Sequence, residues 1–137
     1  ASGSNWSSQP NNSIYYSSYG RLDTYKIPSL SCTSDDVIIV PVGLITSDEV
    51  AFAGGIFGNG VINQSYYLYN TQNYWTMSPA WVYTGGFGRV FYIGSNGGIG
   101  ADSVTYTVPG VRPVINLKAD TKLQGNGTVD SPFEIAA

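Results

Sequence analysis

The stretch YWTMSPAWVYTGGFGRVFYIGSNGGIGADSVTYTVPGVRPVINL, residues 74–117, decides the fold. Its aromatic and β-branched side chains are mixed with serine, threonine and glycine, a composition typical of short strands joined by turns. The dipeptide Asn96-Gly97 within it favours a tight turn, as do Asn59-Gly60 and Asn126-Gly127 elsewhere in the chain. Strands are expected at residues 66–70, 74–78, 89–94, 102–108 and 111–118.

One short helix is expected just upstream of these strands. Thr46 occupies a cap position with Glu49 three residues later, the spacing of a reciprocal capping box. The acidic pair Asp48 and Glu49 suits the positive end of the helix dipole, and Gly54-Gly55 ends the helix after about two turns. Capping accounts for both carboxylates, and a role as metal ligands is the alternative.

The two ends of the chain complete an α+β protein. Residues 1 to about 20 are polar, with a short strand expected at 14–16, and are assigned to an N-terminal edge or linker remnant (1–20) before one domain (21–137). The run at 37–45 indicates a buried strand that Pro41 splits or bends. Ile27, Leu30 and Cys32 are expected to face inward. At the C-terminus, 121–124 and 132–135 are expected to pair as a hairpin around Asn126-Gly127.

Composition excludes several classes of function. The chain has 137 residues, no histidine, one cysteine and six lysine or arginine residues, with a net charge of -3. Six basic residues make no basic patch, so nucleic acid is not expected as a partner. Without histidine there is no Ser/His/Asp or Cys/His set, and one cysteine excludes an internal disulfide or a CxxC motif. We therefore expect no enzyme, no cofactor and no metal, with a hydrolase built on two carboxylates as the remaining catalytic alternative.

The same composition favours a protein displayed outside the cell. Only 11% of residues are charged, while tyrosine, serine and asparagine are abundant, as on antibody-type binding surfaces. No run of 18 apolar residues is present, so no membrane-spanning segment is expected. The expected location is extracellular or at the cell surface.

A candidate binding surface lies within residues 80–106. Tryptophan and tyrosine supply rigid contact area that can also stack on sugar faces, while serine, threonine and asparagine supply adaptable hydrogen bonds. Packing inside the sheet is the alternative for the aromatic rings, and exposure of the aliphatic stem along a strand is the alternative for Arg89. The candidate ligand-binding residues are Trp81, Tyr83, Phe87, Arg89, Asn96, Asp102, Ser103, Thr105 and Tyr106.

Three other side chains near this surface are assigned structural roles. Trp75 and Met77 lie in a regular strand-like run, so we expect them in the core or on a sheet face. Arg112 precedes a proline in the stiff run at 110–117 and is expected to orient loops through hydrogen bonds.

Three blocks of sequence carry a resemblance to a known family. PVGLITSDEVAFAGG (41–55), YYLYNTQNYWTMSPA (66–80) and GVRPVINLKADTKLQGNGTVDSPFEI (110–135) resemble the C-terminal domains of bacterial surface and prepilin-like proteins with a C-type-lectin-like fold. That broad group includes formylglycine-generating-enzyme-like and retroelement-diversified domains, and the likeness covers residues 30 to 135. It implies mostly antiparallel short strands, long loops and a scaffold that displays variable side chains, which in diversified relatives concentrate in a stretch like 80–106.

The chain also departs from that family. The calcium-lectin tripeptides Glu-Pro-Asn, Gln-Pro-Asp and Trp-Asn-Asp are missing, which puts calcium-dependent sugar binding in doubt. The paired cysteines of the formylglycine-generating enzymes are missing too, so that activity is not carried over. The segment at residues 36–37 is also short for the family pattern.

Two functions follow as expectations. The first is a non-catalytic extracellular recognition domain, an adhesin or a pilus-tip-like domain, whose partner is a protein or glycan on another cell or host surface. The second is a pilin-like or filament subunit whose aromatic surface packs against neighbouring copies, because a surface with little charge offers little electrostatic resistance to such packing.

Overall fold

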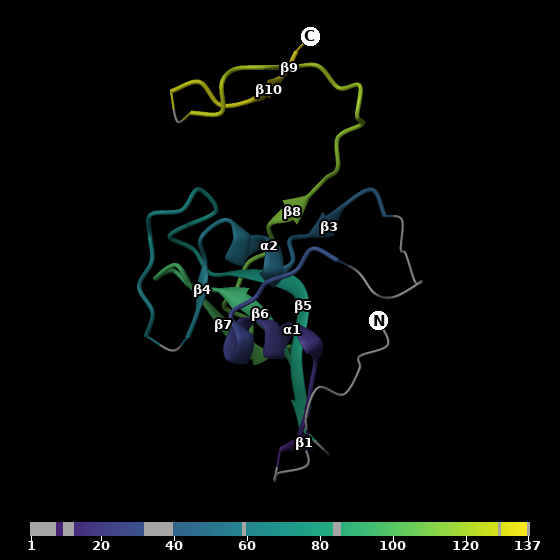
Figure 1. Ribbon diagram of the computed structural model, residues 1–137, viewed down its shortest axis with the longest axis vertical. Helices are drawn as coiled ribbons and strands as arrows, with labels where there is room; N and C mark the ends of the chain where they lie inside the picture. The colour runs from purple at the N-terminus through teal and green to yellow at the C-terminus, as the bar shows by residue number, and fades with distance from the viewer. Residues whose placement is uncertain are drawn as a thin grey trace.

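A six-stranded sheet forms the centre of the computed structural model, which describes residues 8–9, 13–31, 40–58, 60–83, 86–128 and 130–136 (Figure 1). Adjacent strands of this sheet run antiparallel, except for the last pair in the spatial order, which runs parallel. In spatial order the strands are β1 (Ser8–Gln9), β2 (Ser13–Tyr15), β5 (Tyr74–Tyr83), β6 (Gly88–Ile93), β7 (Gly98–Ser103) and β4 (Ile56–Phe57). Two small two-stranded sheets pair β3 (Gly43–Leu44) with β8 (Pro113–Val114) and β9 (Leu123–Gln124) with β10 (Glu134–Ile135).

The predicted helix is confirmed as α2 (Ser47–Phe52). The Thr46 side chain accepts from the backbone N–H of Glu49 at 3.1 Å, and the Glu49 carboxylate accepts from the backbone N–H of Thr46 at 2.7 Å. Both halves of the capping box are therefore formed. Gly54 follows with a φ of 111°, a left-handed conformation that ends the helix as expected.

A second helical segment was not expected from the sequence. The three-residue α1 (Ser17–Tyr19) runs into a π-helix, η1 (Gly20–Tyr25), which ends where Lys26 adopts a φ of 55°. No side chain caps either segment, so the usual start signal is missing from the sequence. Packing on β5 holds α1 instead, and the hydroxyl of Ser18 donates to the carbonyl of Pro79. None of the described helices is long and apolar enough to span a membrane.

Strand β5 has small polar side chains on its buried face. Thr76 donates to the carbonyl of Phe91 at 2.9 Å, and Ser78 accepts from the backbone N–H of Ser47 at 3.0 Å. These bonds compensate for burying the hydroxyls, so the inward positions of β5 do not need to be apolar. Met77 lies between them in sequence and points outward with 54% of its surface exposed, so it lies on a sheet face and not in the core, the second of the two places expected for it.

The apolar core lies between the sheet and the helices. Phe91 and Ile93 of β6 and Ile99 of β7 are fully buried, and the rings of Tyr19 and Phe57 pack around Phe91 with centroids 6.4 and 5.6 Å away. The buried hydrophobic residues are Leu22, Val50, Tyr66, Tyr74, Ala80, Phe91, Ile93 and Ile99.

A buried ion pair ties the two helical segments together. The Arg21 guanidinium of η1 donates twice to the Asp48 carboxylate of α2, both at 2.8 Å, and the backbone N–H of Ser29 donates to the same carboxylate at 2.9 Å. The hydrogen bonds that Arg21 donates to Asp48 raise the pKa of Arg21. Asp48 therefore does more than favour the helix dipole, because it fixes η1, the segment after η1 and α2 in one arrangement.

Residues 26–45 differ from the sequence prediction. Ile27 and Leu30 are exposed rather than inward, and between them the backbone N–H of Ser29 donates to Asp48. Of the predicted strand at 37–45, the structure describes 40–45, and within that part only Gly43–Leu44 is a strand while Val42 is exposed. Cys32 and residues 37–39 lie outside the described residues.

Three predicted strands are also wrong in extent. Residues 66–70 form turns, stabilised by the Tyr66 hydroxyl, which donates to the carbonyl of Gly97 at 2.8 Å. The strand expected at 102–108 instead spans 98–103, and the one expected at 111–118 is reduced to Pro113–Val114. The sequence prediction missed the start of β7 because glycine is uncommon within strands. Glycine is needed there, since a Cβ at Gly100 would lie 2.8 Å from the Tyr92 ring.

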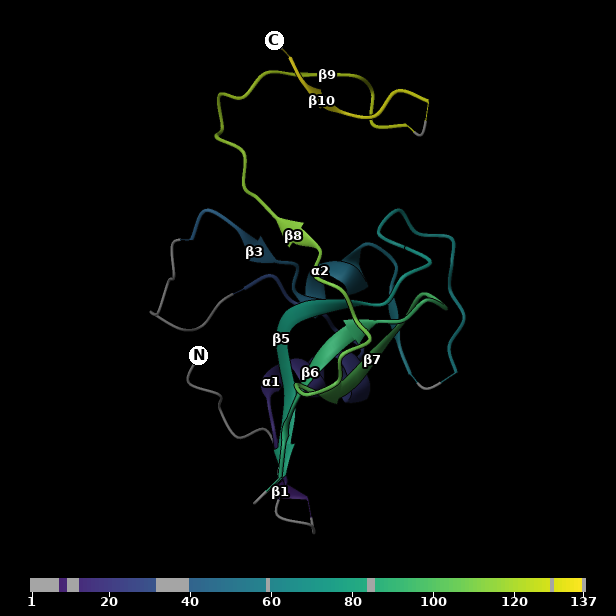
Figure 2. The same ribbon diagram turned by 180° about the vertical axis from the view of Figure 1, so that it is seen from behind.

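The C-terminal hairpin is confirmed and stands away from the body of the protein (Figures 1 and 2). Backbone bonds from Asn126 and Gly127 to the carbonyl of Ser131 close its loop, and Gly127 has a φ of 76°. No described residue after Pro109 is buried. The architecture is α+β as predicted, with mostly short strands and few helical residues.

Candidate functional site

Aromatic rings from three elements meet around Trp81 at one end of the sheet. Tyr19 and Tyr83 pack edge-on against the indole with centroids 5.1 and 6.4 Å away, and Tyr15 lies at 5.7 Å. Tyr83 is exposed and the others are partly buried. These four rings, together with Arg89, are called the Trp81 surface below.

Arg89 covers part of this aromatic group. Its guanidinium carbon lies 5.3 Å from the Trp81 ring centroid and 5.8 Å from that of Tyr83, within the range of cation–π attraction. Its Nη1 also donates to the carbonyl of Ala101 at 3.3 Å and lies 3.5 Å from an Asp102 carboxylate oxygen. About a third of each charged side chain is exposed, so the pair holds the guanidinium in place while leaving it accessible.

Polar side chains of β7 and of the residues just after it lie next to the Trp81 surface. Ser103 pairs with Arg89 across the strands, so the two side chains share a face. Its hydroxyl lies 2.8 Å from that of Thr105, and its backbone N–H donates to Asp102 at 2.7 Å. Phe87, in the connection between β5 and β6, is 66% exposed. The structure thus brings Trp81, Tyr83, Arg89, Asp102, Ser103 and Thr105 to one end of the sheet.

Two predicted site residues lie elsewhere. Asn96 lies in the β6–β7 turn, at the opposite end of these strands from Arg89, where its side chain accepts from the backbone N–H of Gly98 at 3.1 Å. Tyr106 packs against Trp75 and Tyr92, with centroids 6.4 and 6.2 Å away. Tyr92 alternates with the core residues of β6, so this cluster is on the other face of the sheet.

Sequence reasoning missed Tyr15 and Tyr19. Both fall in the segment 1–20 that was assigned to a polar edge, yet β2 pairs with β5 so that Tyr15 lies opposite Trp81. The available signal was the tyrosine spacing in YYSSY (15–19), where polar residues separate aromatic ones. That spacing does not reveal which strand the segment joins.

Tyrosine ionisation provides a test of this packing. Burial, with the Asp23 carboxylate as a smaller cause, raises the pKa of Tyr19 to about 12, from an ordinary 10.0. Tyr19 ionises at a lower pH in the unfolded chain than in the folded chain. The stability that its burial adds to the folded state is therefore complete below about pH 10 and is lost between about pH 10 and 12. We expect the urea midpoint to be level up to about pH 9.5 and to fall above about pH 10.

The control for this prediction is Tyr19→Phe, which cannot ionise. This variant should show a shallower fall above pH 10, while the remaining slope reports other groups such as Tyr66, whose pKa burial also raises to about 12. Identical alkaline slopes for the variant and the parent chain would show that Tyr19 is not packed as described.

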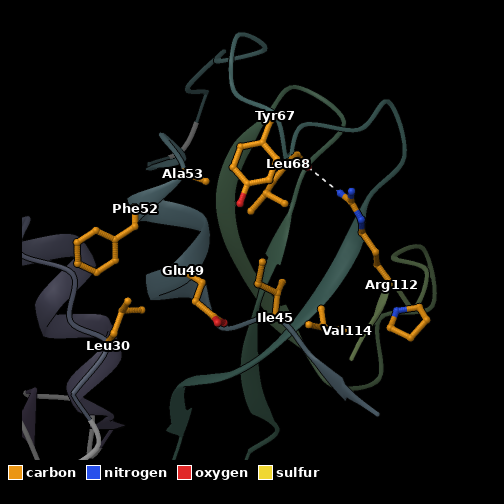
Figure 3. Close-up of a pocket in the computed structure, with 10 residues that line it drawn as sticks. Leu30, Ile45, Glu49, Phe52, Ala53, Tyr67, Leu68, Arg112 and Val114 are labelled. Atoms are coloured by element: carbon orange, nitrogen blue, oxygen red, sulfur yellow. Dashed lines mark hydrogen bonds between the residues drawn. The ribbon is translucent and has the colours of Figure 1, made fainter. Parts of the chain in front are cut away.

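A second surface feature is an apolar groove between α2 and β8 (Figure 3). It has a volume of about 600 Å³ and is called the α2–β8 groove below. Phe52 projects from α2 with 58% of its surface exposed, and Tyr67 from the turn segment is more exposed still. The groove is lined by Leu30, Ile45, Glu49, Phe52, Ala53, Tyr67, Leu68, Arg112, Pro113 and Val114.

The two charged residues of the groove already have partners in the same chain. Glu49 accepts from the backbone N–H and the hydroxyl of Thr46. Arg112 donates to the carbonyl of Leu68 at 2.8 Å, the bond drawn in Figure 3, and its guanidinium carbon lies 5.2 Å from the Tyr74 ring centroid. Arg112 orients the 66–69 turn as the sequence predicts, and the groove presents mainly apolar atoms.

No family model matches the chain, and no curated protein or solved structure matches it significantly. The roles of the two surfaces therefore rest on their own contacts, burial and charge. Among the described residues, no group of three His, Cys, Asp or Glu side chains gathers to hold a metal. What the Trp81 surface offers chemically is rigid aromatic contact area beside a guanidinium and neighbouring hydroxyls.

Proposed function

We propose that the chain is a non-catalytic extracellular recognition domain, an adhesin-like or pilus-tip-like module with a C-type-lectin-like fold. The observation that carries the proposal is the stacking of Arg89 on Trp81 and Tyr83 at an accessible end of the sheet. A guanidinium and rings that are already ordered lose little side-chain entropy when a ligand binds. The mostly stranded α+β architecture with long connections supports the proposed fold.

Within the proposed site, the exposed rings are the anchors and the partly buried ones are their support. Tyr83 and Phe87 are accessible, whereas Trp81 is held by Tyr15 and Tyr19. Aromatic and arginine side chains carry most of the binding energy in protein interfaces, and aromatic faces also stack on sugar rings. The proposed partner is a protein or glycan on another cell or host surface.

Ligand binding by the parent chain and a matched pair of variants tests this function. Phe87 and Phe133 are equally exposed, at 66% and 63%, but only Phe87 neighbours the Trp81 surface in sequence. On a glycan array and on immobilised surface proteins, we expect Phe87→Ala and Tyr83→Ala each to weaken binding by about 2 kcal/mol, roughly 30-fold. At concentrations where the chain is monomeric, Phe133→Ala should bind as the parent chain does.

The outcome that contradicts the proposal is equally specific. Equal binding by the Phe87→Ala, Tyr83→Ala and parent chains would place the ligand elsewhere, and no retained ligand on either array would remove the support for recognition. Circular dichroism of each variant shows that the fold is intact, which is expected because both side chains are exposed.

A pilin-like or filament subunit is the second candidate, favoured by the exposure of Phe87 and by the low share of charged residues in the chain, 11%. In that case the same aromatic surface packs against neighbouring copies. Light scattering across a concentration series separates the candidates, because Phe87→Ala then lowers the mass of the assemblies instead of the affinity for an added ligand.

A further inference from the structure

The C-terminal hairpin has one apolar face. Leu123 pairs with Ile135, so these two side chains share a side of the hairpin, and Phe133 lies one residue before β10 with its ring against Gly127. Gln124 and Glu134 form the neighbouring pair and point the other way. All three apolar side chains are exposed, Phe133 to 63%.

A hairpin this short is expected to be stabilised by packing against another surface. Two-stranded hairpins are marginally stable in water, and this one is only two residues long on each side. Both views show it apart from the sheet and helices (Figures 1 and 2). The exposed residues 115–120 connect it to β8.

The α2–β8 groove is the matching uncovered surface on the same chain. Phe52, Leu30 and Val114 are exposed around it, and its two charged side chains are occupied by Thr46 and Leu68. The groove carries one negative and one positive side chain, Glu49 and Arg112, each hydrogen-bonded within the chain, and its other lining residues are apolar or aromatic. This lining matches the apolar face of the hairpin.

We propose that the apolar face of the β9–β10 hairpin docks in the α2–β8 groove of a second copy of this chain. In the structure the hairpin stands apart from the sheet and helices of its own chain, so its apolar side chains are open to another copy (Figures 1 and 2). This contact uses different residues from the Trp81 surface, and it holds or fails independently of the recognition proposal.

The geometry also sets the form of the assembly. The hairpin and the groove are different patches, so a single docking event is heterologous. Two copies that exchange hairpins close into a dimer, whereas successive dockings extend into a chain of subunits. Light scattering distinguishes a single doubled mass from a series of increasing masses, and either result supports the contact.

Size-exclusion chromatography with light scattering, over a concentration series, tests the contact through three variants. Phe133→Ser alters the hairpin, Phe52→Ser alters the groove, and Phe87→Ser is the control of similar exposure. We expect the parent chain and Phe87→Ser to assemble alike. Each of the other two should raise the apparent dissociation constant by about tenfold or more.

A crosslink identifies which copy supplies the hairpin. A photoreactive phenylalanine analogue at position 133 is introduced, and chains labelled with ¹⁴N and ¹⁵N are mixed before illumination. The expected product joins position 133 to α2 or to residues 66–69 in peptides of mixed isotope content.

Three outcomes would overturn the proposal. They are a mass of 14.6 kDa at every concentration, crosslinks that never mix isotopes, and assembly that is lost in Phe87→Ser but kept in Phe133→Ser.

Discussion

Replacing Phe91 by alanine is expected to lower the free energy of unfolding by about 4 kcal/mol. The side chain is fully buried at the centre of the sheet, with the rings of Tyr19 and Phe57 packed against it. Removing the ring loses its transfer free energy and leaves a cavity that the surrounding strands cannot fill. Urea unfolding followed by tryptophan fluorescence measures the change.

The control for Phe91 is the same substitution at an exposed phenylalanine. Phe133→Ala, studied at a concentration where the chain is monomeric, should change stability by no more than about 0.5 kcal/mol. A loss below about 1.5 kcal/mol for Phe91→Ala would mean that Phe91 is not at the centre of the core.

Replacing Asp48 by alanine is expected to cost about 3 kcal/mol. The carboxylate is 3% exposed and accepts two bonds from Arg21 and one from the backbone N–H of Ser29. Its removal leaves a largely buried guanidinium and a backbone donor without their acceptor. Because the Arg21 side chain keeps 30% of its exposure and can partly rehydrate, the cost lies at the lower end of the range for broken buried pairs.

A double-mutant cycle isolates this ion pair. Arg21→Ala in the Asp48→Ala background should cost much less than Arg21→Ala alone, because the shared interaction is already gone. Asp120→Ala, at an exposed acidic position, should change stability by no more than about 0.5 kcal/mol. Additive effects of the two substitutions would show that Arg21 and Asp48 do not interact in solution.

The sequence predicted those elements whose signals are local. The capping box at Thr46 and Glu49 marks the start of α2, and Asn126-Gly127 marks the final hairpin. Strand β6 also follows from its composition. Each depends on residues within a few positions of one another, which is the range that propensity and turn chemistry report.

The parts that could not be predicted depend on distant partners. Arg21 and Asp48 are 27 residues apart, and nothing local marks them as a pair. Ile27 and Leu30 are exposed, which their hydrophobicity does not indicate. Met77 faces outward because its neighbours Thr76 and Ser78 face inward, where their hydroxyls are hydrogen-bonded, and an apolar pattern does not detect such positions.

In the candidate site too, the residues that are close in sequence could be predicted and those contributed by distant segments could not. Trp81, Tyr83 and Arg89 are close in sequence and in space because one antiparallel pair, β5 and β6, carries all three. Tyr15 completes the surface from a strand more than sixty residues away in the chain, so only the pairing of β2 with β5 reveals it. Tyr106 follows β7 closely in sequence but packs on the opposite face of the sheet.

The recognition proposal is tested most directly by the indole N–H resonances of Trp81 and Trp75 during titration with the strongest ligand from the arrays. Trp81 belongs to the proposed site, whereas Trp75 packs with Tyr92 and Tyr106 on the other face of the sheet. Tryptophan-to-phenylalanine variants assign the two signals. The account predicts that the Trp81 resonance shifts to saturation while that of Trp75 stays in place. A shift of Trp75 alone, or no shift of Trp81 at saturation, would contradict it.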